Sequence, residues 1–92
     1  NFADGGTTRL IEGVREAKGL IVARTDEERI DFLTKRADMT KTAAAKVIET
    51  VTQEEGSAPE SVWDFVQGIT AVARRSEHQD ARITMERSAG KL

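Results

Sequence analysis

The sequence predicts an all-α fold, a compact bundle of four to five short helices that forms one domain over residues 1–92. Apolar residues recur at helical spacing along most of the chain. Residues that cap helix ends stand before and after several of these stretches. Strand signals are weak, and the strongest is the short apolar run "GLIVART" at residues 19–25. Because only three Phe and one Trp are present, aliphatic residues and Ala must fill most of a modest core.

The first helix is expected to begin after the "DGGTT" stretch at residues 4–8. Its apolar positions are Leu10, Val14, Ala17 and Ile21. Their spacing favours a helix that continues into residues 19–25, although an apolar run of that length also suits a strand. The sequence alone leaves residues 19–25 open between helix and strand.

Two further helices have clear boundary signals. "TDEE", at Thr25 to Glu28, is a capping box that opens a helix reaching about Ala37. After the short turn "DMT", either Thr40 or Thr42 can cap the next helix. That helix ends in "EEG", where Gly56 is suited to a left-handed cap.

The C-terminal part predicts two more helices. "SAPE", at Ser57 to Glu60, is interpreted as a second capping box with Pro59 in the first helical turn. The helix after it has a wide apolar stripe with Trp63 at its margin. The core residues expected from this stripe are Trp63, Phe65, Ile69 and Val72. A final helix is expected from about Gln79 to Ala89.

Composition excludes several classes of protein. The formal charge of −2 argues against a globally basic nucleic-acid binder, and no apolar run approaches the roughly 20 residues of a membrane span. The absence of Cys removes disulfides and thiolate chemistry and fits a reducing compartment, so we expect a cytoplasmic location. The chain starts at Asn1 rather than Met and ends abruptly after Leu92, and we therefore expect the excised C-terminal domain of a longer protein.

Catalytic and metal-binding patterns are weak. His78 stands beside Glu77 and close to Asp80, but adjacent residues point apart on a helix, whereas zinc needs three or four convergent ligands. A solvated loop between helices explains this cluster better. No nucleophile–base arrangement, phosphate-binding glycine loop or dinucleotide fingerprint is visible. We therefore predict no catalytic residue, no cofactor and no metal, and do not expect an enzyme within these residues.

Residues 32–49, "FLTKRADMTKTAAAKVIE", resemble a helix-turn-helix and the two-helix opening of bacterial histone-like proteins. Asp38 replaces the usual turn Gly, and residues 43–45 are all Ala where base-reading side chains should project. No strand-rich arm follows, as the histone-like fold requires. Because an antiparallel helix pair explains the same spacing, nucleic-acid contact through Lys41 and Lys46 is an alternative and not the leading interpretation.

Basic residues are enriched near the C-terminus, with five cations against three anions between residues 71 and 91. The candidates for phosphate contact are Arg74, Arg75, Arg82 and Arg87. Asp80–Arg87 and Arg82–Glu86 can instead pair along a helix, at about 0.2–0.5 kcal/mol each. A solvated, salt-bridged face is therefore favoured over a binding patch.

Two aromatic residues are candidate contacts for a protein partner. Phe32 lies off the apolar stripe of its helix, so it is either a partner contact or part of a second packing surface, and packing is favoured. Trp63, although assigned to the core, also lies at the margin of its stripe and could reach the surface.

The closing stretch carries a family resemblance. Its motifs are Trp63-Asp64, then Gly68-Ile69-Thr70-Ala71, Asp80 with Arg82, and Glu86-Arg87 with Ala89-Gly90-Lys91-Leu92. They resemble the C-terminal end of the phage/plasmid-like protein family, also called domain of unknown function 932. The resemblance covers about the last third of the chain clearly and the region from Thr25 loosely. It implies a phage, plasmid or integrated-element origin and carries no catalytic residues across.

Together these features favour a non-catalytic accessory domain of a mobile-element protein. It would contact a protein partner or the rest of its parent chain, or associate with itself. The alternative is a nucleic-acid-binding helical domain that uses residues 32–49 and the C-terminal basic residues. Salt separates the two, because phosphate contacts weaken steeply as salt rises and apolar contacts do not.

Overall fold

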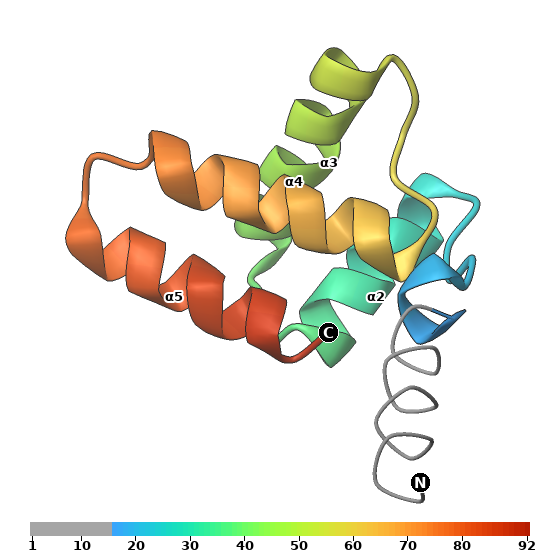
Figure 1. The fold of residues 1–92 in the computed structure, drawn as a ribbon, viewed down its shortest axis with the longest axis horizontal. Coiled ribbons are helices and arrows are strands. Elements are labelled where there is room, and N and C mark those ends of the chain that lie inside the picture. Colours follow the sequence, from blue (N-terminus) through green and yellow to red (C-terminus); the bar gives the residue numbers. More distant parts are fainter. Residues whose placement is uncertain (1–15) are drawn as a thin grey trace, which may run out of the picture.

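The computed structural model of the chain describes residues 16–92 as an all-α bundle, which confirms the predicted fold class. Its main helices are α2 (Asp26–Arg36), α3 (Lys41–Glu55), α4 (Val62–Arg75) and α5 (Gln79–Gly90). Helix α4 packs against both α3 and α5, and α3 also packs against α2. In Figure 1, α4 and α5 lie side by side in opposite directions, and α3 crosses α4. The predicted start of the first helix, with Leu10 and Val14, lies outside the described residues.

The predicted helix caps at Thr25, Thr40 and Gly56 are confirmed. The Thr25 hydroxyl accepts a hydrogen bond from the Glu28 amide at 3.2 Å and so begins α2. Thr40 is the residue that caps α3, through a bond from the Ala43 amide at 3.1 Å. Gly56 ends α3 in the left-handed conformation, with φ of 79°. Local hydrogen bonding therefore set these boundaries as the sequence indicated.

The prediction that "SAPE" opens the next helix is wrong. Helix α4 begins at Val62, and its capping box joins Ser61 to Asp64. The Asp64 carboxylate accepts hydrogen bonds from the amides of both Glu60 and Ser61, at 3.2 Å each, which holds these two residues ahead of the helix. Pro59 is buried in the connection before α4 instead of lying in its first turn.

The preferred helical interpretation of residues 19–25 is also wrong for most of that stretch. Residues 16–19 are helical, but the chain then becomes extended, and Ile21 pairs with Ser61 in an isolated antiparallel bridge. The Val22 amide donates to the Glu60 carbonyl at 2.7 Å, and the Val62 amide donates to the Leu20 carbonyl at 3.1 Å. The connection before α4 supplies these backbone partners, and β-branched Ile21 and Val22 suit an extended strand.

The core lies where α2, α3 and α4 meet. Its largest fully buried side chains are Phe65, Leu33, Ile69, Val47 and Pro59. Helices α3 and α4 approach closely at Gly68, because a Cβ atom there would lie 2.4 Å from Cγ2 of Val51. Phe65 and Ile69 are core as predicted and Val72 is half-buried against the core, but Trp63 is not part of it.

Candidate functional site

Three large apolar side chains are exposed on one part of the molecule. Leu20 is 60% exposed, Ile21 is 50% exposed and Trp63 is 48% exposed. We call these three residues the apolar edge cluster. The assignment of Trp63 to the core is therefore wrong, because two positions along a helix correspond to a rotation of about 200°, which places Trp63 nearly opposite the buried Phe65.

Backbone pairing brings the apolar edge cluster together. The Leu20 carbonyl accepts from the amide of Val62, the residue before Trp63, and Ile21 stands opposite Ser61. Two segments about 40 positions apart in the sequence therefore meet at this point. Exposed single apolar residues are common on proteins, but three on adjoining segments give a partner an unusual amount of apolar surface to cover.

Arg29, which the sequence reasoning missed, positions this region. Its side chain is 9% exposed, and its Nε donates to the Pro59 carbonyl at 2.8 Å. One terminal nitrogen pairs with Asp26 at 2.9 Å, and the other donates to the Arg24 carbonyl at 3.2 Å. The guanidinium thus joins α2 to both extended segments. The Asp26–Arg29 spacing predicts only an ordinary exposed ion pair, so nothing local signalled the burial.

Phe32 is largely occupied by packing. Its ring lies 4.9 Å from the ring of Phe65, centroid to centroid, and the Arg36 guanidinium lies 5.9 Å from its centroid. The side chain is half-buried against the core. This geometry fits the favoured packing interpretation and leaves Trp63 as the stronger candidate for partner contact.

Helix α3 presents Lys41 and Lys46 on its outer face. Both residues are exposed, and neither forms an ion pair with any residue between 16 and 92. Asp38, in the turn before α3, adopts the left-handed conformation with φ of 58°. The turn therefore has the geometry that Gly usually supplies, here adopted by an Asp.

The C-terminal basic residues do not join those lysines in one patch. Arg75 forms an ion pair with Glu54 near the end of α3, and Arg82 donates from Nε to the Ser76 carbonyl at 2.7 Å. Thirteen positions separate Lys41 from Glu54, or about 20 Å along the helix axis. Arg74 and Arg87 are exposed on α4 and α5. The suggested Asp80–Arg87 and Arg82–Glu86 pairs are not formed.

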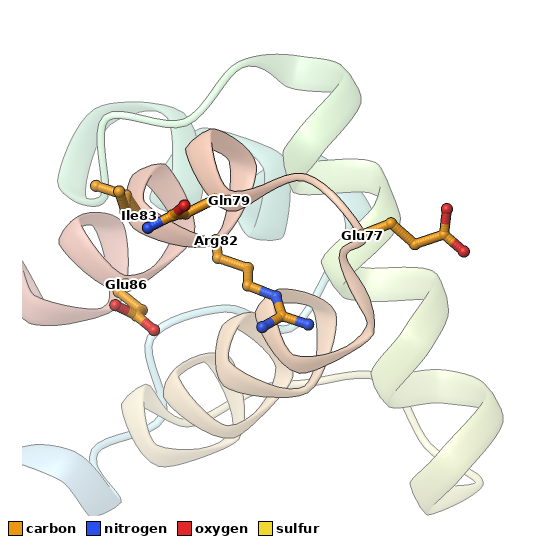
Figure 2. A pocket seen from close by; sticks show the side chains of 5 residues that line it. All are labelled: Glu77, Gln79, Arg82, Ile83 and Glu86. Atoms are coloured by element: carbon orange, nitrogen blue, oxygen red, sulfur yellow. The ribbon is translucent and has the colours of Figure 1, made fainter.

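A shallow hollow at the start of α5 offers little chemistry. It is lined by Glu77, Gln79, Arg82, Ile83 and Glu86. Figure 2 shows the Glu77 carboxylate pointing away from the other four side chains. Within residues 16–92, no three His, Asp or Glu side chains lie together as a metal site would require. His78 precedes α5 without capping it through its side chain.

The C-terminal end is tied to the turn between α2 and α3. The Lys91 ammonium donates a hydrogen bond to the Asp38 carboxylate. That hydrogen bond, together with the positive charge of Lys91, lowers the pKa of Asp38 below its usual value of 3.8. Both partners are exposed, so this contact fastens one end of α5 weakly.

Comparison with known proteins adds no family or fold relative. No family model matches the chain, and no curated protein or solved structure is significantly similar to it. The resemblance to the phage/plasmid-like family therefore stays a prediction. Among the helices of the described part, none has the length and apolar character to cross a membrane.

Proposed function

We propose that this chain is a non-catalytic interaction domain that binds a protein partner through the apolar edge cluster. The observation that supports the proposal most directly is the meeting of Leu20, Ile21 and Trp63 on adjoining backbone segments while all three remain about half exposed. The predicted phage or plasmid origin would make the partner another protein of the mobile element, or another part of the parent chain.

Trp63 is the expected centre of this contact. Trp is enriched among the few interface residues that supply most binding free energy. Burying a large apolar side chain contributes about 1.5–3 kcal/mol. Because Arg29 and the Ser61–Asp64 capping box hold the surrounding backbone, the surface is already ordered before a partner arrives.

A random peptide library displayed on phage, selected against the purified chain, tests the proposal without a known partner. We expect enriched peptides whose binding shifts the amide resonances of Leu20 and Ile21 and the indole resonance of Trp63. Trp63→Ala should abolish that binding. Ile83→Ala is the matched control, because Ile83 is an exposed apolar residue on α5. Enriched peptides that map elsewhere, or no enrichment, would contradict the proposal.

A second candidate function is nucleic-acid binding through α3. The observation that favours it is the left-handed turn at Asp38, followed by a helix whose N-terminal half exposes Lys41 and Lys46. In helix-turn-helix proteins, the corresponding end of the second helix contacts base edges in the major groove. Glu49 shares this exposed face and opposes phosphate binding, which is why this candidate ranks second.

An amide-resolved NMR titration with short duplex and single-stranded DNA tests the second candidate. Binding through Lys41 and Lys46 predicts shifts at α3 at about 50 mM salt that vanish at about 200 mM salt. Lys41→Gln should weaken the effect, and Arg87→Gln on α5 is the control. A spectrum unchanged at both salt concentrations would eliminate nucleic-acid binding by these residues.

A further inference from the structure

We propose that the partner binds as an extended strand that pairs with the open backbone edge at Ile21, with apolar side chains at its centre and acidic side chains at its ends. This inference rests on the proposed function, since it names the chemistry of the segment that the apolar edge cluster would bind. It depends on three features of the region, which are its backbone geometry, its exposed side chains and its flanking charges.

The backbone of Ile21 faces away from the pairing that already exists. In the bridge, the two hydrogen bonds belong to the neighbours of Ile21, namely the Leu20 carbonyl and the Val22 amide. Ile21 and Ser61 are therefore a non-hydrogen-bonded pair, whose own N–H and C=O groups point to the outer edges. Within residues 16–92, no group bonds to the backbone of Ile21. An added strand would supply one acceptor and one donor there.

The side chains beside this edge are apolar on both faces. Successive side chains of an extended segment point to opposite faces, which places Leu20 on one face and Ile21 on the other. Both are at least half exposed, and Trp63 follows the paired segment in the first turn of α4. A strand paired with Ile21 would place its own side chains next to those of Leu20 and Ile21, so its central residues should be apolar.

The charges beside the extended segment favour a strand from another protein, and not a second copy of this chain, as the bound partner. The nearest charged residues before and after the extended segment are Lys18 and Arg24, and neither forms an ion pair with residues 16–92. Antiparallel pairing of two copies at Ile21 would bring Arg24 of one copy towards the helical turn of residues 16–19 in the other, which carries Lys18, and the two cations would repel. A peptide with acidic ends would instead complement both cations.

Three peptides with blocked termini and the same central sequence of apolar β-branched residues test the proposal. The first has Glu at both ends, the second has the same sequence with N-methyl groups on the amides of one edge, and the third has Lys at both ends. We expect the Glu-ended peptide to shift the Ile21 amide and to slow its hydrogen exchange. N-methylation should weaken binding at least about tenfold, because it removes the donors of the new strand. The Lys-ended peptide should also bind more weakly, and the difference should shrink as salt rises.

The peptide results distinguish a failure of the strand inference from a failure of the proposed interaction function. Equal binding of the methylated and unmethylated peptides would overturn strand pairing, while the apolar edge cluster would stand as a contact surface. The Ile21 amide resonance should shift at about 1 mM Glu-ended peptide, a concentration that detects dissociation constants as weak as about 1 mM. The absence of such a shift would overturn the strand inference. The proposed function would then be decided separately, by whether peptides enriched on the parent chain lose their binding to the Trp63→Ala variant. Equal binding of the Glu-ended and Lys-ended peptides would overturn the charge assignment.

Discussion

The crossing of α3 and α4 and the apolar edge cluster use similar residues with opposite results. At the crossing, Phe65 and Ile69 are fully buried and Gly68 lets the two helices approach closely. At the edge, Ile21 and Trp63 are about half exposed, although hydrogen bonds of the neighbouring residues hold both segments in place. The difference lies in what packs over each region, and not in hydrophobicity. An ordered apolar surface that no described residue covers is suited to binding, whereas the crossing provides stability.

The largest expected loss of stability comes from a substitution in the core at the α3–α4 crossing. Phe65→Ala should lower the free energy of unfolding by about 3–5 kcal/mol, because it leaves a cavity between α2, α3 and α4. That is a large share of the roughly 5–15 kcal/mol typical of a domain. Urea denaturation followed by circular dichroism measures the loss. Trp63→Ala is the matched control and should change stability by no more than about 0.5 kcal/mol. Equal losses for the two variants would abolish the distinction between core and surface.

The next effect concerns the residue that supports the edge. Arg29→Met should cost about 1–3 kcal/mol, because the Pro59 carbonyl loses its donor in a buried position. Arg29→Lys should recover only part of this loss, since an ammonium cannot reproduce the planar guanidinium contacts. Amide spectra should show the largest changes at residues 20–24 and not at the α3–α4 crossing. Changes concentrated at the crossing would show that Arg29 supports the core and not the edge.

A smaller effect tests how tightly the crossing is packed. Gly68→Ala places a methyl group 2.4 Å from Cγ2 of Val51 and 3.0 Å from Cγ1 of Val47. Overpacking costs about 1–3 kcal/mol and helix propensity returns up to about 1 kcal/mol, so we expect a net loss of about 1–2 kcal/mol. Thermal unfolding measures it. Gly90→Ala, with nothing within 4 Å of the new atom, should not destabilise. A Gly68→Ala variant as stable as the parent would show a loose crossing.

The smallest effect concerns the exposed pair that fastens α5 to the turn before α3. Because Lys91 lowers the pKa of Asp38 in the folded chain, the pair stabilises above the usual value of 3.8 and its contribution is lost as pH falls through the lowered pKa. Asp38→Asn should therefore be slightly less stable than the parent at neutral pH and equal to it in acid. Tm measured across pH at low salt checks this, with Lys91→Gln as the matched variant. A difference that persists in acid would exclude the ion pair as its cause.

The sequence predicted local features better than contacts between distant segments. The caps at Thr25 and Gly56 depend on neighbours within a helical turn, so their chemistry is visible in a short window. The extended state of residues 20–23 depends on hydrogen bonds to Glu60 and Val62, which no local pattern shows. Glu60 and Ser61 take part in this pairing and are also bonded to Asp64, so they lie ahead of α4 and not within it as "SAPE" suggested.

The candidate site was predicted only in part for the same reason. Trp63 was identified as a possible surface contact because it lies at the margin of its apolar stripe. The sequence favours a helix for Leu20 and Ile21 and leaves a strand open, so it does not predict their approach to the segment of Trp63. Burial of Arg29 depends on three segments converging, and its sequence neighbours gave no sign of this.

The most direct measurement uses the single Trp of the chain, which is Trp63. Quenching of its fluorescence by acrylamide reports the exposure of the apolar edge cluster without any label. We expect efficient quenching and red-shifted emission in the free chain, and protection when a peptide enriched by the library selection is added. Weak quenching and blue-shifted emission in the free chain would contradict the central claim, because they would show that this surface is already covered.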